Sequence, residues 1–455
     1  MATKIANEEF PVENLYANNF LSLHKFKYEH KGEQFCVITG DMASGKSLII
    51  KLLEFFNNIY VPLMSMDYKE IIENLKFDNF SEKVIIDFMI RFNLKENMVF
   101  DLEYSCSYKK IIFSVKLFRN SPKGKIELKS EFLDNQLKEW RDYLEYYFKS
   151  KTKSKSFGKF ISPLELYRLE NDLNKMLSLK FNNLYPFATI FIPATRASLA
   201  TKLPLNKRNE DTIDKLNSNF RDYYLNSYER LIESIKFLPE TKYRDKINDI
   251  LKATIKINGD IHLTSKDGRD VDIYNAASGQ QESFYILLLL EKLPILKKGY
   301  YRNCNIYIEE PEAHLFPYGQ RRILELIVEI FNDINSKCSE TKCSPIKFYI
   351  TTHSPYVLNA INNMLMKGNL LKKFPNSAKK ILNDKKTKNI PPLDYEKISA
   401  IFINNKGKFN NILKEYNGNR LINPDDINNI SRRIEDYFSI LNELDSELKK
   451  NNKNA

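Results

Sequence analysis

The sequence lacks long hydrophobic runs, and this absence sets the first limit on its function. No apolar run approaches the ~18 residues that a membrane-spanning helix needs. The longest, Phe284–Leu290, is followed directly by Glu291 and Lys292. The first residues, MATKIANEEF, lack the basic segment and apolar stretch that mark a secretory signal. We therefore expect a cytoplasmic protein without membrane contact.

Cysteine is also scarce, with five residues in a chain of 455. Cys338 and Cys343 have the spacing of half a zinc site, but no second pair of cysteine or histidine residues lies near them in the sequence. Isolated reduced thiols are therefore the preferred interpretation. Because 43% of the residues are hydrophobic, the chain has enough apolar side chains to fold around a core.

The charge balance is basic, with a formal net charge of +12 at pH 7. A basic surface favours nucleic acid because binding releases counterions from the phosphates. The basic residues are mostly lysine rather than arginine, however, and asparagine and isoleucine are also abundant, which is the pattern that AT-rich coding produces. DNA therefore stays a candidate partner without being the preferred one.

Apolar patterning predicts an α/β protein. Two apolar strand segments, Leu15–His24 and Phe35–Thr39, precede a helix at Ser47–Phe56. Short β-type runs follow, starting with VIIDFMIRF, and they predict an antiparallel sheet. We expect four parts: an N-terminal half of an ATPase core at 1–82, an antiparallel β and helical arm insertion at 83–187, a second core half at 188–361 with a helical insertion at about 205–250, and a basic C-terminal appendage at 362–455.

The segment GDMASGKS fits the phosphate-binding pattern G-x-x-x-x-G-K-[ST], between an apolar strand and a helix. Gly40, Ser44 and Gly45 are expected in a loop whose backbone N–H groups hold phosphate oxygens at a helix N-terminus. Lys46 would place its charge at the β and γ phosphates, and the Ser47 hydroxyl would ligate Mg²⁺. The strand and helix context disfavours a chance Gly-Lys-Ser turn. The sequence thus predicts ATP and Mg²⁺ as cofactors.

A second segment, NIYIEEPEAHLFP, is an apolar strand that ends in two adjacent acids. Glu309 is placed to hold Mg²⁺ through its water shell, and Glu310 to orient or deprotonate the attacking water. On their own, two carboxylates at a strand end would indicate only an exposed turn. Their position after a phosphate-binding loop favours the catalytic interpretation.

Two weaker signals lie on either side of this acid pair. Ser278, Gly279 and Gln280 begin the strongly apolar helix ASGQQESFYILLLL, where a Ser-Gly turn is either a second phosphate-binding device or an ordinary helix cap. The strand KFYITT ends at His353, which either donates to a γ-phosphate or is structural. The order and spacing of the four motifs carry more information than any one of them.

Together these motifs resemble the ABC-type ATPases of the SMC/RecF/OLD branch. IEEPEAHLFP looks like their Walker B and D-loop, ASGQQ like their signature, and TTHSP like their H-loop. The resemblance implies an ABC-ATPase P-loop fold in which two protomers sandwich two ATPs, with Ser278 and Gly279 of one chain closing on the γ-phosphate held by Lys46 of the other. It also implies that FIPATRAS carries a basic contact residue, Arg196, for which a surface salt bridge is the alternative.

The chain departs from this pattern at several positions. Met42 and Ala43 stand where such ATPases often carry Asn-Gly, and Gln280 replaces the second glycine of the signature. The only glutamine between the P-loop and the signature is Gln136, in helical surroundings, so the Q-loop is not located. These departures leave ATP binding in place and predict slow hydrolysis.

About a hundred residues follow His353, without the acid cluster of a TOPRIM nuclease, so the chain looks like the ATPase half of a two-component system. It is most similar to the ATPase subunit of PARIS-type anti-phage defence (AriA-like), whose effector is a separate TOPRIM nuclease, AriB. Septu (PtuA-like) and retron-associated ATPases are rivals. The first hypothesis is therefore an ATP-dependent homo-oligomer that senses a phage trigger protein and releases a toxic effector.

The second hypothesis is a DNA-repair ATPase of the RecF or SMC type. It is supported by the basic balance and by Lys367–Lys388, a stretch with eight lysines and one acid for which a solvated face is the alternative. A metabolic NTPase or kinase is disfavoured, because such monomeric enzymes need neither the signature nor the H-loop.

Overall fold

The structure, a computed structural model, describes the larger part of the chain. Described are residues 12–59, 78–95, 97–108, 111–135, 188–194, 196, 220–299, 304–341, 346–383, 387–404, 408–416 and 418–423, with a few positions between 138 and 146. The predicted arm at 147–187, the first part of the helical insertion at 205–219, Gln136 and Cys343 lie outside these residues. No helix among the described residues is both long and apolar enough to cross a membrane.

A six-stranded sheet forms the centre of the fold, in the order β14-β13-β3-β12-β11-β7. Its strands are β3 (Phe35–Gly40), β7 (Ala188–Ile192), β11 (Cys304–Glu309), β12 (Ile346–Thr352), β13 (Ile398–Ile403) and β14 (Phe409–Asn411). All neighbours pair in parallel except β14, which is antiparallel to β13. Because helices cover both faces, the inner strands are buried throughout and form near-continuous apolar runs. The predicted α/β class is confirmed.

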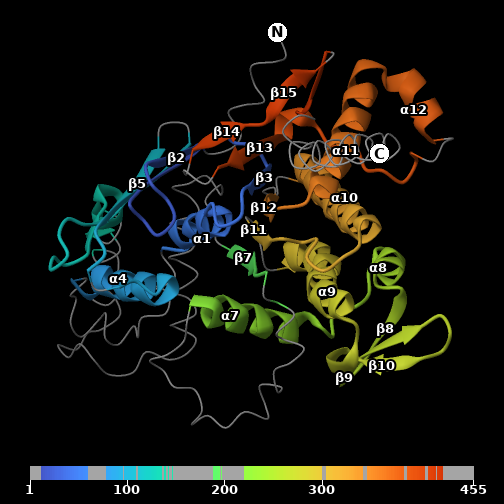
Figure 1. The fold of residues 1–455 in the computed structure, drawn as a ribbon, viewed down its shortest axis with the longest axis horizontal. Coiled ribbons are helices and arrows are strands. Elements are labelled where there is room, and N and C mark those ends of the chain that lie inside the picture. Colours follow the sequence, from blue (N-terminus) through green and yellow to red (C-terminus); the bar gives the residue numbers. More distant parts are fainter. Residues whose placement is uncertain are drawn as a thin grey trace, which may run out of the picture.

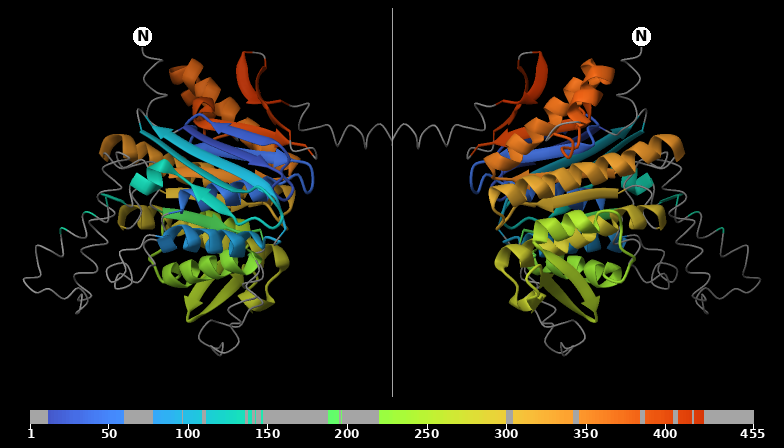
Figure 2. Two further views of the ribbon diagram at one scale, coloured as in Figure 1. Left: turned by 90° about the vertical axis from the view of Figure 1, so that its left-hand side faces the viewer. Right: turned by 90° about the vertical axis from the view of Figure 1, so that its right-hand side faces the viewer.

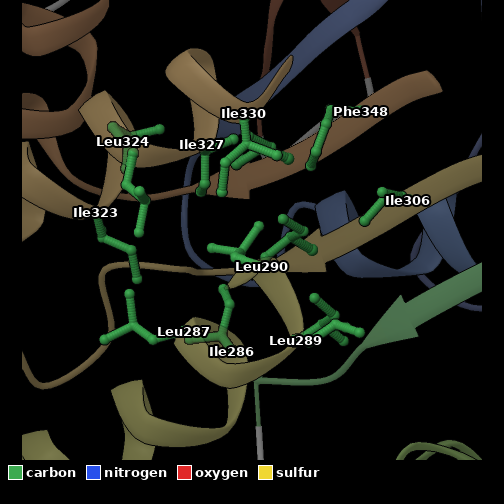
Figure 3. Packing of buried hydrophobic residues seen from close by; sticks show 14 of the residues in the cluster. Ile286, Leu287, Leu289, Leu290, Ile306, Ile323, Leu324, Ile327, Ile330 and Phe348 are labelled. Atoms are coloured by element: carbon green, nitrogen blue, oxygen red, sulfur yellow. The ribbon is translucent and has the colours of Figure 1, made fainter. Parts of the chain in front are cut away.

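The two faces of this sheet belong to two different hydrophobic cores. On one face the strand residues Ile306 and Phe348 pack against helices α9 (Ser278–Gly299) and α10 (Pro317–Thr341). Figure 3 shows this core, with Leu290 from α9 and Ile327 from α10 among the labelled residues. On the other face the alternate side chains of the same strands pack with α1 (Lys46–Asn57). Figure 1 shows α1 and α9–α10 on opposite sides of the sheet. Because successive side chains of a strand point to opposite faces, each strand contributes alternate residues to the two cores.

A second, antiparallel sheet packs on the core that contains α1. Its order is β2-β1-β4-β5-β6, and its strands are β1 (Val12–Asn18), β2 (Phe26–His30), β4 (Phe100–Tyr108), β5 (Ile111–Arg119) and β6 (Glu127–Lys129). The strand expected at Leu15–His24 is confirmed only as far as Asn18, because the chain turns there and returns as β2. Residues 12–30 therefore pair with the segment expected to be an insertion, and the boundary predicted at residue 83 does not separate two units.

The run VIIDFMIRF is a helix rather than the predicted strand. It belongs to α4 (Asp78–Phe92), in which Phe80, Val84, Phe88 and Phe92 are buried at intervals of four residues. Such spacing places one stripe of a helix against the core. Ile86 and Ile90 are exposed, and these extra apolar residues hid the helical period in the sequence.

The helical insertion includes α7 (Phe220–Ile235) and α8 (Arg244–Leu251). A small antiparallel sheet follows, made of β8 (Ala253–Asn258), β9 (Asp260–Ser265) and β10 (Asp270–Asp272), and a 3₁₀ turn, η5 (Ile273–Asn275), leads into α9. In both side views of Figure 2 this sheet lies at the bottom, with the C-terminal helices and strands at the top. It therefore places the start of α9 at the side of the molecule away from the C-terminal segment.

The C-terminal segment is not the separate appendage that was predicted from residue 362. Helix α11 (Pro355–Lys373) runs across that boundary and is followed by α12 (Pro375–Asn383), η6 (Tyr395–Lys397) and the strands β13, β14, β15 (Leu413–Tyr416) and β16 (Asn419–Ile422). Strand β13 pairs in parallel with β3, the strand before the P-loop, so it is part of the central sheet. Because β13 and β3 are far apart in the sequence and parallel strands are not joined by a short turn, no local sequence pattern indicates that they pair.

A buried polar cluster joins the two sheets at the end of α1 away from the P-loop. The Glu13 carboxylate accepts hydrogen bonds from the hydroxyls of Tyr104 (2.6 Å) and Tyr349 (2.5 Å) and from Nζ of Lys347 (3.4 Å). Burial alone would raise the pKa of Glu13, but Lys347 and these hydroxyls outweigh it and lower the pKa to about 2. Nearby His30 is fully buried, and neither ring nitrogen has a hydrogen-bond partner in the described chain. Burial, with the Lys347 charge, lowers the pKa of His30 to about 3.

We predict that His30→Phe flattens the dependence of stability on pH. The unfolded chain protonates His30 near pH 6.5 and the folded chain only near pH 3, so the wild type loses stability as pH falls through this window, by about 1.4 kcal/mol per pH unit. Urea unfolding between about pH 7 and pH 5 measures this slope. A variant whose free energy of unfolding falls as steeply as that of the wild type would contradict the prediction.

Candidate functional site

Three adjacent strands bring the sequence motifs together. The P-loop follows β3, His353 follows β12, and the acid pair ends β11, and these strands are neighbours in the central sheet. Because they are parallel, their carboxyl ends share one edge: Thr39 lies beside Thr352, and Thr351 beside Glu309. This edge is where open α/β sheets bind ligands.

The P-loop has the backbone shape that a phosphate cradle requires. Ala43 and Gly45 have φ of 59° and 95°, so the loop turns through left-handed conformations. A Cβ on Gly40 would lie 2.1 Å from the carbonyl oxygen of Ile403 in β13, so the close approach of that strand requires glycine there. No side chain caps the start of α1, which leaves its first N–H groups to bind an anion.

A pocket of about 480 Å³ opens on this loop. It is lined by P-loop residues 43–48, by Leu21 and Ser22 from the β1–β2 turn, and by Lys51, Phe92 and His353. The Ser44 hydroxyl is buried there and makes no hydrogen bond within the described chain. The predicted phosphate-binding residues Ser44 to Ser47 thus line one cavity.

The Lys46 side chain contacts the backbone of its own loop. Its Nζ donates to the carbonyl oxygens of Gly40 (2.9 Å) and Asp41 (2.6 Å). Burial lowers the pKa of Lys46 to about 8, against the opposing effect of the Glu310 and Asp41 carboxylates. A phosphate in the pocket would replace the two carbonyls with a charge-assisted contact.

The second acid of the pair lies against the histidine. Glu310 Oε1 is 2.8 Å from Nε2 of His353, and this hydrogen bond lowers the pKa of Glu310. Glu310 has a φ of 42°, a left-handed conformation that a non-glycine residue adopts only when its surroundings hold it there. Its backbone N–H donates to the Thr351 carbonyl (3.0 Å). The strained backbone therefore aims the carboxylate along the sheet edge toward His353.

A third carboxylate, Glu312, was missed by the sequence reasoning. It is buried, accepts hydrogen bonds from the Thr352 hydroxyl and from the His353 backbone N–H (3.2 Å), and has a pKa raised by burial. It thereby fixes the backbone that carries the His353 ring. The signal was present in the sequence as a third acid in IEEPE, separated from the pair by Pro311.

The first acid, Glu309, has its two oxygens in different environments. Oε2 accepts a hydrogen bond from the Ala194 N–H (2.9 Å), and Oε1 lies 2.9 Å from Nζ of Lys51. The sequence reasoning also missed Lys51, although it is the one cation in the otherwise apolar run SLIIKLL of α1. The ion pair places a second lysine beside the P-loop.

The donor atoms in this region suit Mg²⁺. The Ser47 hydroxyl lines the pocket and the Glu309 carboxylate stands at the strand end, and Mg²⁺ takes oxygen ligands, usually one or two from protein beside nucleotide phosphates. Among the described residues no group of three or more His, Cys, Asp and Glu side chains is placed to hold a metal ion. Bound there, Mg²⁺ would neutralise phosphate charge.

The signature residues do not reach the pocket of their own chain. Ser278 is exposed at the start of α9, and neither it nor Gly279 lines the cavity. A Cβ on Gly279 would lie 2.8 Å from the carbonyl oxygen of His314, so the first turn of α9 packs directly on the loop after the acid pair. The Gln280 side chain donates to the Leu251 carbonyl (2.9 Å), so it is engaged within its own chain, and its contact with ATP stays a prediction.

Arg196 is neither a surface salt bridge nor a basic contact for a ligand, so both expectations were wrong. Its side chain is completely buried. The guanidinium donates to the carbonyl oxygens of Pro193 (3.1 Å), Glu282 (3.0 Å), Glu309 (2.9 Å) and Glu310 (2.9 Å). Arg196 therefore ties together the segment after β7, the N-terminal part of α9 and the end of β11.

Comparison with known proteins identifies the family. The family described as AAA ATPase domain matches residues 12–358, which include the P-loop, the signature, the acid pair and His353. A search of curated proteins found no match.

Similar solved structures include two heads of SMC proteins and a recombination mediator. The SMC head domain from Thermotoga maritima is 14% identical, with 77% of this chain and 91% of that chain covered and a TM-score of 0.33. An SMC head bound to the C-winged helix domain of ScpA is also 14% identical, with 76% of this chain and 92% of that chain covered and a TM-score of 0.36. The recombination mediator protein RecF with an ATP analogue is 14% identical, with 89% of this chain and 100% of that chain covered and a TM-score of 0.33.

Lys46→Ala is expected to abolish ATP binding, because it removes the one cation that the P-loop itself directs at the phosphates. Isothermal titration at ~0.1 mM chain should detect no heat from ATP, a loss of at least about a hundredfold in affinity. The exposed Lys31→Ala is the matched control and should bind like the wild type. Wild-type affinity in Lys46→Ala would remove Lys46 from the site.

Arg196→Lys is expected to lower the free energy of unfolding by about 2–4 kcal/mol, because one ammonium cannot satisfy four buried carbonyls that a planar guanidinium reaches. Arg269, an exposed arginine in the β9–β10 turn, supplies the control, since Arg269→Lys should change stability by less than about 0.5 kcal/mol. Urea unfolding measures both. If both changes lower the free energy of unfolding by the same small amount, the hydrogen bonds of Arg196 do not stabilise the fold.

Proposed function

Because the chain belongs to the AAA ATPase domain family and is an ATPase, we propose that two or more copies of it close around ATP to form a sensor and scaffold that holds a toxic effector in anti-phage defence. The effector we propose is a separate nuclease of the TOPRIM type, and the trigger is a phage protein. The assembly acts in the cytoplasm without membrane contact. The observation that carries the proposal is the incomplete ATP site of the single chain.

The incomplete site consists of a pocket and a signature that face different ways. Lys46, Ser47 and His353 line the pocket, whereas Ser278 is exposed outside it at the start of α9. A helix N-terminus that binds phosphate must point at it. A second copy, related by a two-fold axis, would bring its own Ser278 to the phosphates in this pocket, and the first copy would do the same in return.

Exposed apolar side chains at the same sheet edge support this arrangement. Met42 in the P-loop is 84% exposed, Phe316 after the acid pair 87%, and Tyr356 after His353 52%. They belong to the P-loop, the loop after the acid pair and the helix after His353, three segments at the carboxyl edge of the central sheet. Large apolar side chains gathered at one edge indicate a surface that a partner covers. Because an isologous dimer buries this edge in both copies, a second copy is the partner that fits best.

The alternative function is a DNA-binding repair ATPase of the RecF or SMC type, which the net charge of +12 favours. The basic stretch Lys367–Lys388 gives it little support. Lys367 is buried and donates to three backbone carbonyls, and Lys372 pairs with Glu396 (2.8 Å). A gel shift at ~50 mM and ~200 mM salt separates the two functions, because binding to phosphates weakens steeply with salt. Duplex binding that falls in this way would favour the repair ATPase.

Glu310→Gln is expected to trap the ATP-bound assembly. The amide keeps the shape of the side chain and its contact with His353 but cannot activate water, so ATP stays bound. Light scattering after size-exclusion chromatography with ATP and Mg²⁺ should show a mass at least twice that of the nucleotide-free chain. Lys46→Ala is the control and should keep its nucleotide-free mass. If the measured mass of Glu310→Gln is the same with and without ATP, the proposal is contradicted.

Effector retention is tested in the same variants. The chain is co-expressed with the nuclease encoded beside it, and the nuclease should co-purify with Glu310→Gln more than with Lys46→Ala. Equal recovery with both variants would separate nucleotide state from effector binding and reject the scaffold.

A further inference from the structure

We propose that Lys51 is a tethered cation that stands in for Mg²⁺ at Glu309, so that the chain binds ATP with little dependence on the metal. The proposal rests only on ATP binding at the P-loop and not on assembly or on an effector. It concerns a residue five positions beyond Lys46 on α1, which no phosphate-binding pattern includes.

The position of Lys51 is fixed by its surroundings. Its side chain is 13% exposed and lines the same pocket as Lys46 and Ser47. The Nζ lies 2.9 Å from Glu309 Oε1 and 5.8 Å from the centre of the Phe191 ring. A charge held between a buried carboxylate and an aromatic face is much less free than a surface lysine. The ammonium is therefore a permanent part of the pocket wall.

Glu309 is held so that only one of its oxygens is available to a cation. Oε2 is occupied by the Ala194 N–H, while Oε1 is buried and accepts no hydrogen bond of good geometry from the described chain. Lys51 Nζ, 2.9 Å away, is the cation that neutralises Oε1. Glu309 itself ends the strand beside β12, at the sheet edge that carries the pocket, so the Lys51–Glu309 pair lies next to the P-loop.

The charge balance gives the consequence. Without Lys51, an unpaired Glu309 carboxylate would lie in a poorly solvated position near the phosphates and repel them, and Mg²⁺ would be needed to offset that repulsion. With Lys51 in place the carboxylate is already neutralised. Replacing Lys51 with a neutral residue should therefore weaken ATP binding mainly when the metal is absent.

The experiment measures the affinity for a fluorescent ATP analogue in Mg²⁺ and in EDTA. For the wild type, the two dissociation constants should agree within about threefold. In Lys51→Met, which keeps the apolar stem, the EDTA value should rise by about tenfold or more, while the Mg²⁺ value stays within about threefold of the wild type. Lys51→Arg keeps the charge and should resemble the wild type. If the ratio of the dissociation constant in EDTA to that in Mg²⁺ is the same for Lys51→Met and the wild type, the proposal is overturned.

A double variant shows whether Lys51 acts through Glu309 or directly on phosphate. If it acts through Glu309, Lys51→Met combined with Glu309→Gln should recover the EDTA affinity to within about threefold of Glu309→Gln alone. If binding stays weak in both buffers, Lys51 contacts the phosphates itself and the proposal is wrong. Thermal melts confirm that each variant is folded. Failure here leaves ATP-dependent assembly untouched, because assembly is measured by mass and not by metal dependence.

Discussion

The buried guanidinium of Arg196 holds the catalytic edge of this ATPase together. It donates to backbone carbonyls just after β7, at the end of β11 and near the start of α9, and so ties α9 to two strands that already pair with each other and share the contact from the Ala194 N–H to Glu309. The acids Glu309 and Glu310 and the signature helix are therefore fixed to one another.

The charges around the P-loop are all engaged within the described chain. Lys46 binds the carbonyls of its own loop, Lys51 faces Glu309, and Glu310 binds His353. ATP must exchange the first and last of these contacts for contacts with phosphate. These exchanges cost part of the free energy of ATP binding.

The location of the site was predictable from the sequence, because each motif ends an apolar strand and parallel strands share their carboxyl edge. The role of Arg196 was not, because its partners are backbone carbonyls of segments far apart in the chain. Strand β13 was missed for a similar reason, since its pairing with β3 is set by tertiary packing. In α4, exposed Ile86 and Ile90 concealed the helical period. Lys51 was invisible because only the fold brings it to Glu309.

The central claim is that two copies of the chain complete each ATP site, and mixing two inactive variants tests it most directly. Lys46→Ala lacks the P-loop cation, and Ser278→Arg blocks the signature. Neither should hydrolyse ATP alone. In an equal mixture, random pairing gives one intact composite site in half of the dimers, so about a quarter of the wild-type rate should return. A mixture as inactive as its two parents would contradict the claim.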